Sequence, residues 1–186
     1  MSCSLRILGV PGSLRAASVN RRLLQLLAGQ MPDGMGMSLY AQLGELPLFN
    51  PDVEFPPPAA VVHWMTALQR ADIVLIASPE YAHGVTGVIK NALDWAVSSE
   101  VMVNKPVLVL NASPRAQHAD AALRETLAVM NARLMTEASV VFPMLGYRGT
   151  DEALLASPDF VQARCQVFEV VSRLATHPAG AAPSAS

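Results

Sequence analysis

Between an apolar run, Leu5-Arg6-Ile7-Leu8-Gly9-Val10, and a leucine-rich stretch, Arg21-Arg22-Leu23-Leu24-Gln25-Leu26-Leu27-Ala28, the chain reads Gly12-Ser13-Leu14-Arg15-Ala16-Ala17-Ser18-Val19-Asn20. The apolar run is typical of a buried strand, and the leucine-rich stretch is typical of a helix. A strand that turns sharply into a helix delivers backbone N–H groups and the positive end of the helix dipole to one point. The order of these elements therefore predicts an anion-binding loop.

The side chains of this loop favour phosphate as the anion. Ser13, Ser18 and Asn20 are short hydrogen-bonding residues, and Arg15 has a planar charged group that suits phosphate oxygens. The loop lacks the lysine of a nucleoside triphosphate loop and the Gly-x-Gly-x-x-Gly pattern of a dinucleotide loop. It suits a single terminal phosphate, such as that of flavin mononucleotide (FMN). The alternative is an ordinary helix start in which Ser18 is the N-cap.

Apolar segments alternate with helical stretches along the rest of the chain. We expect strands at 5–10, 37–40, 72–77, 106–111 and 138–142, and helices at roughly 19–29, 59–71, 87–99, 117–134 and 157–175. Such alternation with short links favours a parallel sheet with helices on both faces. With five strands in 186 residues, we predict an α/β fold, a flavodoxin-like three-layer sandwich with strand order 2-1-3-4-5.

Two segments fall outside this alternation. Residues 45–58 contain five prolines and show no period, so we expect an extended surface loop with Leu48 and Phe49 buried, in a packing or substrate-gating role. Residues 177–186 are dominated by Ala, Pro, Gly and Ser, and we expect a disordered tail there. The remainder, residues 1–176, is predicted to form a single domain.

Composition excludes several classes of protein. Apolar residues make up 52% of the chain, and 13 basic and 15 acidic residues give a net charge of −2 without a basic run, which argues against a nucleic-acid partner. No apolar run approaches the roughly 20 residues that span a membrane. The N-terminus lacks the pattern of a signal peptide, and Cys3 and Cys165 are not placed as a redox pair. We expect a cytoplasmic protein without a membrane span, a disulfide or a metal site.

The loops after strands 1, 3 and 4 are the places to look for a ligand, because this fold binds ligands where the strand order reverses. After the third predicted strand the chain reads Ser78-Pro79-Glu80-Tyr81-Ala82-His83-Gly84-Val85-Thr86-Gly87. Pro79 fixes its φ angle, while Gly84 and Gly87 allow the backbone to approach a ligand closely. Tyr81 can supply part of the flat wall that a flavin ring requires.

Two motifs together resemble the NADPH-dependent FMN reductase family. They are Gly12-Ser13-Leu14-Arg15 followed by Ser18-Val19-Asn20, and Pro79-Glu80-Tyr81 followed by Lys90-Asn91-Ala92-Leu93-Asp94-Trp95. The resemblance covers about residues 5–143. It implies a flavodoxin-like fold with FMN as cofactor and NADPH or NADH as co-substrate, in a family that contains quinone, azo-dye and chromate reductases. Members are commonly homodimers or homotetramers, with the helix after Pro79-Glu80-Tyr81 at the subunit contact.

By the same resemblance, the FMN phosphate is bound by four side chains and two backbone positions, namely Ser13, Arg15, Ser18 and Asn20 with the backbone of Leu14 and Val19. The isoalloxazine ring is bound largely by backbone atoms of Pro79, Glu80, Tyr81 and Ala82, and Ser113 lies in a further loop near the flavin. Two positions depart from the commonest pattern. Ala82 stands where an Asn is common, and Ser113-Pro114-Arg115 replaces a glycine-rich loop.

The resemblance implies an NAD(P)H-dependent FMN reductase or quinone reductase, which passes a hydride through flavin N5 to a small-molecule acceptor in a ping-pong cycle. The cofactor carries this chemistry, so we nominate no catalytic side chain. Arg115 either contacts the 2′-phosphate of NADPH or forms a surface ion pair, and His83 either donates to the flavin or a quinone or has no function. The alternative class is a non-enzymatic FMN-binding electron carrier or regulatory protein. Arg15 and the small net charge count against a carrier of the flavodoxin kind.

Overall fold

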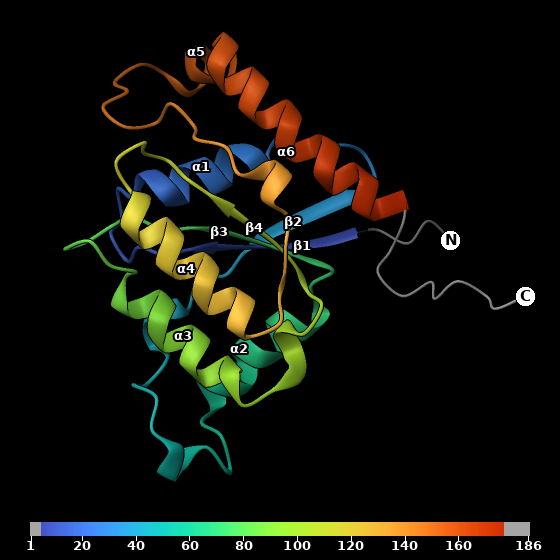
Figure 1. The fold of residues 1–186 in the computed structure, drawn as a ribbon. Coiled ribbons are helices and arrows are strands. Elements are labelled where there is room, and N and C mark those ends of the chain that lie inside the picture. Colours follow the sequence, from blue (N-terminus) through green and yellow to red (C-terminus); the bar gives the residue numbers. More distant parts are fainter. Residues whose placement is uncertain (1–4, 177–186) are drawn as a thin grey trace, which may run out of the picture.

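The computed structural model describes residues 5–176, which contain one parallel five-stranded sheet (Figure 1). Its strands, in spatial order, are β2 Met35–Leu39, β1 Leu5–Pro11, β3 Ile73–Ala77, β4 Pro106–Leu110 and β5 Arg133–Leu134. This order confirms the predicted flavodoxin-like class, and it places the reversal of strand order between β1 and β3. The tail predicted at 177–186 and Cys3 lie outside the described residues.

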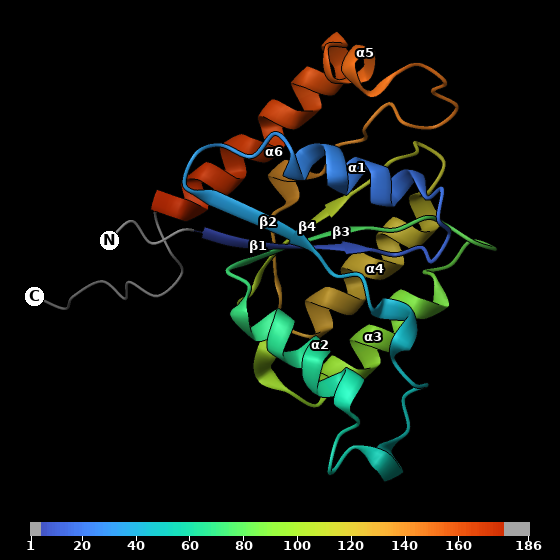
Figure 2. The same cartoon turned by 180° about the vertical axis from the view of Figure 1, so that it is seen from behind.

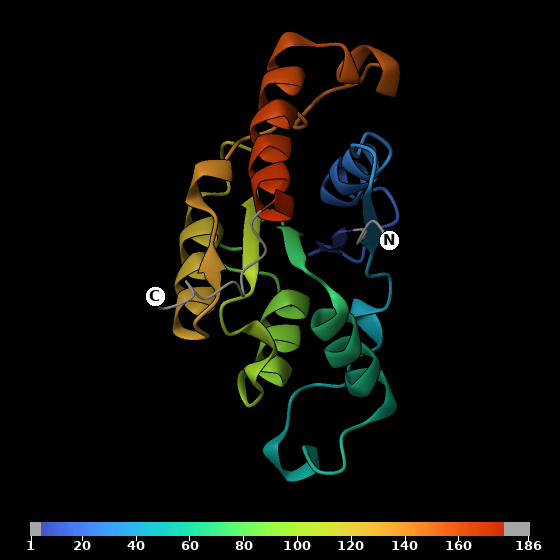
Figure 3. The ribbon, with the colours of Figure 1, turned by 90° about the vertical axis from the view of Figure 1, so that its right-hand side faces the viewer.

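Helices cover both faces of the sheet, as Figures 2 and 3 show from two further sides. One face carries α1 Val19–Ala28 and α6 Pro158–Thr176, and the other carries α2 Ala59–Arg70, α3 Gly87–Val97 and α4 Gln117–Val129. Each face has its own apolar core, because a parallel sheet with covered faces buries the side chains of both. Every residue of β3 and β4 is buried, as their apolar runs predict.

The short helix α5, Asp151–Leu155, is absent from the predicted elements. It is too short to show a helical period in the sequence. The Thr150 hydroxyl caps it by accepting from the Ala153 N–H at 3.3 Å, and Arg22 of α1 donates to Asp151 at 2.7 Å. These contacts hold the segment before α6 against α1.

The fifth strand is predicted in the wrong place. The strand consists of Arg133 and Leu134, which pair with the start of β4, whereas the predicted segment 138–142 makes only an isolated parallel bridge between Val141 and Asn111. The predicted helix 117–134 ends at Val129, and Asn131 adopts a left-handed φ of 56°, which interrupts the helix before β5. Ala138 and Phe142 are buried for a different reason: they belong to the core under α6, where Phe142 packs on Phe160 at 5.1 Å between ring centroids.

Residues 45–58 extend beyond α2 and α3 as a surface segment with one short 3₁₀ turn at Pro51–Val53 (Figure 1). Phe49 is half-buried and packs edge-on against Trp95 at 5.1 Å, as expected, but Leu48 is 84% exposed, so its predicted burial is wrong. The backbone explains this. Asn91 binds both the Pro47 carbonyl and the Phe49 N–H, and these two contacts flank the outward-facing Leu48.

Candidate functional site

A cleft of about 300 Å³ lies at the carboxyl ends of β1, β3 and β4. It is lined by the loops that follow these three strands and by one residue from a fourth segment, Leu145. Its position is the one that the fold favours for ligands, beside the reversal of strand order. Of the predicted site residues, all except Leu14 and Ala82 line the cleft, and they are Ser13, Arg15, Ser18, Val19, Asn20, Pro79, Glu80, Tyr81 and Ser113.

Three polar side chains of the first loop are buried in the wall of the cleft. Ser13, Ser18 and Asn20 are only 4%, 6% and 7% exposed. The Ser13 hydroxyl accepts from the Arg15 N–H at 3.4 Å, and the Ser18 hydroxyl accepts from the Arg21 N–H at 3.3 Å. Each hydroxyl therefore keeps its own proton free to donate to a ligand. The Asn20 side-chain oxygen is buried without a hydrogen-bond partner among the described residues, an arrangement that a bound ligand would relieve.

The start of α1 adds backbone donors to these side chains. Ser18 is the N-cap, as the alternative interpretation of this loop expects. The N–H groups of Val19 and Asn20 lie in the first turn, where a helix offers them no internal acceptor. The helix cap and an anion site are therefore compatible here, because one Ser18 hydroxyl can serve both. Arg15, also in the wall, brings a positive charge to the same end of the cleft.

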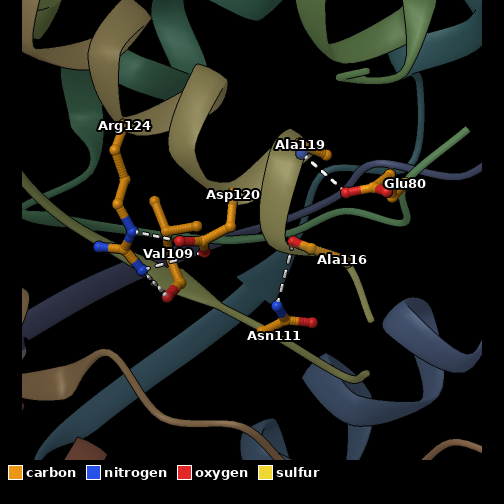
Figure 4. Close-up of polar contacts among 7 residues, drawn as sticks. All are labelled: Glu80, Val109, Asn111, Ala116, Ala119, Asp120 and Arg124. Atoms are coloured by element: carbon orange, nitrogen blue, oxygen red, sulfur yellow. Dashed lines mark hydrogen bonds and ion pairs between the residues drawn. The ribbon is translucent and has the colours of Figure 1, made fainter. Parts of the chain in front are cut away.

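The loop after β3 forms a second wall. Tyr81 is 54% exposed, and its backbone N–H and carbonyl close a tight turn with Gly84 through hydrogen bonds of 3.3 and 2.9 Å. The Glu80 side chain does not point freely into the cleft, because one carboxylate oxygen accepts from the Ala119 N–H of α4 at 2.9 Å (Figure 4). Ala82 is exposed and lies outside the lining, and His83 stacks on His118 with ring centroids 4.3 Å apart.

The loop after β4 forms a third wall and is fixed by Asn111. The Asn111 side chain accepts from the Ser113 N–H at 2.9 Å and donates to the Ala116 carbonyl at 3.4 Å, the second contact being drawn in Figure 4. The Ser113 hydroxyl in turn accepts from the Arg115 N–H at 3.2 Å. Arg115 lines the cleft, and its side chain forms no ion pair within residues 5–176. That observation removes the surface ion pair as an account of Arg115 within this part of the chain.

Two predicted residues lie elsewhere, and several lining residues were not predicted. The Leu14 side chain is exposed and lies next to Gly44, so only its backbone remains available to the cleft. The unpredicted lining residues are Ala17, Ser78, Asn111, Ala112, Ala116 and Leu145. All but Leu145 lie within or beside the three loops, so extending each motif to its neighbours would have found them. Leu145 lies in a segment without a motif, and no signal in the sequence connects it to the cleft.

Other kinds of site find no support in the described part of the chain. No group of three or more His, Cys, Asp or Glu side chains between residues 5 and 176 is arranged to hold a metal ion. Among the same residues, no helix has both the length and the apolar content that crossing a bilayer requires. The described residues thus form a flavodoxin-like fold with a cleft at the carboxyl edge of its sheet, whose lining includes buried polar side chains and two arginines.

Comparison with known proteins identifies the family. Residues 5–145 match the NADPH-dependent FMN reductase family, and the chain belongs to that family. It is 37% identical over 152 residues to an NAD(P)H-dependent FMN reductase of Pseudomonas aeruginosa, a match that covers 76% of this chain and 79% of that protein. It is 34% identical over 111 residues to a quinone reductase of Pseudomonas putida, covering 58% of this chain and 59% of that protein.

A solved structure of a flavoenzyme has a similar fold. FerB, a flavoenzyme NAD(P)H:(acceptor) oxidoreductase from Paracoccus denitrificans, superposes with a TM-score of 0.71 at 25% identity, covering 92% of this chain and 96% of that chain. The family predicted from two motifs is thus confirmed. The chain is an oxidoreductase of the flavoprotein class, and FMN and NAD(P)H are the cofactors of its family.

Proposed function

We propose that the protein is an FMN-dependent NAD(P)H oxidoreductase that reduces quinone-like or other small acceptors. The observation that carries this proposal is the buried polar wall of Ser13, Ser18 and Asn20 beside Arg15, with an unpartnered Asn20 oxygen at the start of a helix. Buried polar groups without partners are rare in folded proteins, and a helix start suits an anion. We place one FMN-binding domain at residues 1–176.

The residues of the first loop fit the phosphate end of FMN. The hydroxyls of Ser13 and Ser18 have protons to donate, and Arg15 supplies a charge-assisted contact to phosphate oxygens. The backbone N–H groups of Leu14 and Val19 complete the predicted set. The Asn20 side-chain amide can donate to a phosphate oxygen or accept from a hydroxyl of the cofactor.

The other two loops fit the ring end. The backbone of Pro79, Glu80, Tyr81 and Ala82 would face one edge of the isoalloxazine, and Tyr81 is exposed enough to lie against a flat ring. Ser113, whose hydroxyl proton is free to donate, would lie near the ring from the β4 loop. Leu145 adds an apolar side chain to the lining of the cleft.

The proposed ping-pong hydride transfer from NAD(P)H through flavin N5 to the acceptor is chemistry that FMN would supply when bound in this cleft. The part of this chain is to bind and orient the reactants. No side chain in the cleft needs to move a proton for that purpose, so we nominate no catalytic acid or base. Arg115, which has no ion-pair partner in the described residues, is available to an anionic group of the second substrate.

We further propose a cytoplasmic homodimer or homotetramer without a nucleic-acid partner. The helix α3 and the segment 45–58 are the candidate subunit contact. Asn91 and Trp95 of α3 fix the backbone at Pro47, while Leu48 and Phe55 of the same segment are each 84% exposed. Large apolar side chains on a well-anchored segment are typical of contact surfaces.

The test is flavin retention, followed by turnover. The purified protein is mixed with FMN, desalted and examined by visible absorption, together with Arg15→Ala and the matched control Arg21→Ala, which removes the same charge from a residue outside the cleft. We expect a retained flavin spectrum in the parent and the control, and a weakened one in Arg15→Ala. NADPH oxidation with a quinone then distinguishes an enzyme from an electron carrier or regulatory protein. A parent protein that retains no flavin would refute the proposal.

A further inference from the structure

The loop after β3 is held in a backbone conformation that its own residues disfavour. Ala82 and His83 have φ angles of 48° and 58°, in the left-handed region where a side chain crowds the backbone. Such conformations persist where the surrounding structure determines them. The two hydrogen bonds between Tyr81 and Gly84 close a tight two-residue turn, a geometry that requires a positive φ at both central residues. Contacts with a neighbouring element hold this turn in its place.

Helix α4 supplies the external support through two contacts. The Glu80 carboxylate accepts from the Ala119 N–H at 2.9 Å (Figure 4), and the His83 ring lies nearly parallel to the His118 ring, at an angle of 10°. Ala119 is the third residue of α4, and the N-cap residue Ala116 has no side chain that could accept from it. Glu80 therefore takes the place of a capping side chain, from a position 39 residues earlier in the chain.

The hydrogen bond between Glu80 and the Ala119 N–H also directs the charge of the Glu80 carboxylate toward α4. Glu80 is the one carboxylate among the lining residues, and it lies between loops that carry Arg15 and Arg115. No ion pair within residues 5–176 joins Glu80 to either arginine. Its charge instead faces the N-terminal end of α4, where the helix dipole favours an anion. Both arginines thus remain available to anionic ligands.

We propose that Glu80 is a positioning residue: through Ala119 it fixes the backbone of the β3 loop in the conformation that receives the ring end of the ligand. The role is indirect, since the carboxylate is engaged by α4. The identity of the ligand in this inference rests on the proposed function. The effect of Glu80 on the loop does not depend on that function. It distinguishes Glu80 from Arg15, whose effect is confined to the phosphate end.

The test uses two flavins and two substitutions at Glu80. Glu80→Ala removes the acceptor, whereas Glu80→Gln keeps an amide oxygen that can still accept from the Ala119 N–H. Binding of FMN and of riboflavin, which has no phosphate, is measured by flavin fluorescence. We expect Glu80→Ala to weaken both flavins by the same factor, about tenfold, as befits the loss of a charge-assisted hydrogen bond, and Glu80→Gln to restore most of the affinity. Arg15→Ala should weaken FMN alone.

A second readout requires no ligand. Amide exchange of Tyr81 and Gly84 in the apoprotein, followed by NMR, should quicken in Glu80→Ala and return toward the parent rate in Glu80→Gln. Asp120→Asn is the matched control, because it removes a carboxylate from the first turn of α4 that pairs with Arg124 and does not touch the β3 loop (Figure 4). It should leave both the exchange rates and riboflavin binding unchanged.

The outcomes separate this inference from the proposed function. Faster exchange in Glu80→Ala but not in Asp120→Asn supports the positioning role even if the parent binds no flavin, in which case the proposed function fails alone. Parent-like exchange and parent-like riboflavin affinity in Glu80→Ala would overturn the inference while FMN binding by the parent still supports the function. Equal effects of Glu80→Ala and Asp120→Asn would also overturn it, since they would show only a general loss of α4 stability.

Discussion

Gly12 lies directly against Ser78, so that a Cβ built on Gly12 would come within 2.6 Å of the Ser78 Cβ. The same Cβ would also meet the Ile89 side chain at 2.8 Å. Gly12 donates its N–H to the Ala77 carbonyl at 2.8 Å, which joins the loops after β1 and β3 at the base of the cleft. The absence of a side chain at position 12 therefore allows the two walls of the cleft to meet.

Gly12→Ala should accordingly destabilise the protein and weaken FMN binding together. Overpacking of this kind costs about 1–3 kcal/mol of unfolding free energy. Urea unfolding and FMN titration measure the two effects. Gly87→Ala is the matched control, because a Cβ at Gly87 meets nothing within 4 Å. The double variant Gly12→Ala/Ser78→Gly should recover part of the loss, and an additive double variant would contradict the proposed clash.

Asn91 joins α3 to the segment 45–58 through two hydrogen bonds of 2.8 and 2.9 Å. Asn91→Ala leaves the Phe49 N–H and one contact of the Pro47 carbonyl unmade, so we expect a loss of about 1–3 kcal/mol in unfolding free energy. Chymotrypsin should cleave the variant faster within residues 45–58 than the parent. Lys90→Ala, on the exposed side of the same helix, removes a pair with Asp94 and should cost only about 0.5 kcal/mol. Equal cleavage of Asn91→Ala and the parent would show that the segment is anchored elsewhere.

The parts of the fold that the sequence predicts well are those determined by local pattern. The strand, the loop and the helix from Leu5 to Ala28 follow from an apolar run, a glycine turn and a leucine repeat, and the structure reproduces them within one residue at each end. The buried strands β3 and β4 follow from uninterrupted apolar runs. Two loops of the cleft are then fixed by the strand order alone, since parallel strands bring their carboxyl ends to one edge.

The parts that the sequence does not predict depend on contacts between distant residues. The edge strand β5 has only two residues paired with β4. Farther along β4, the Val109 carbonyl accepts a hydrogen bond from the Arg124 side chain at 3.0 Å, and Asp120 holds that side chain through an ion pair (Figure 4). This carbonyl is therefore already bonded where a longer β5 could pair. Leu145, in the segment between β5 and α5, lines the cleft together with loops that lie far from it in the sequence. Burial of Phe142 under α6 produces an apolar run that is indistinguishable from a strand in the sequence.

Asp72 directly precedes β3, at the end of the sheet opposite the cleft, and it makes the stability of the protein depend on pH. Burial acts to raise the pKa of its carboxyl, but hydrogen bonds from the Arg6 side chain and backbone, with the charges of Arg6 and Lys105, outweigh burial and lower that pKa. A carboxyl whose pKa is lower in the folded protein stabilises the fold above its unfolded pKa, and the contribution is lost as the pH falls through the folded value.

Asp72→Asn should therefore lower the unfolding free energy by about 1 kcal/mol at pH 7, the range of a partly exposed ion pair. The difference from the parent should begin to shrink as the pH falls below the ordinary carboxyl pKa, and it should approach zero only below the lowered pKa of the folded protein. Urea unfolding at several pH values measures this. The control Asp33→Asn changes an exposed carboxylate that has no ion pair in the described residues, and its effect should stay near zero throughout. A pH-independent loss in Asp72→Asn would assign the effect to packing.

Arg115 provides a prediction about the second substrate that follows from the proposed function. Arg115 lines the cleft and has no ion-pair partner within the described chain, and its backbone N–H donates to the Ser113 hydroxyl. NADPH differs from NADH by a 2′-phosphate, a group that arginine binds well. Arg115→Ala should therefore lower kcat/KM for NADPH about tenfold and leave that for NADH nearly unchanged, as expected for one lost charge-assisted contact. Arg70→Ala, which removes the same charge from an exposed residue outside the lining, should change neither value. Equal losses for the two nucleotides would instead place Arg115 at a part of the substrate that NADPH and NADH share.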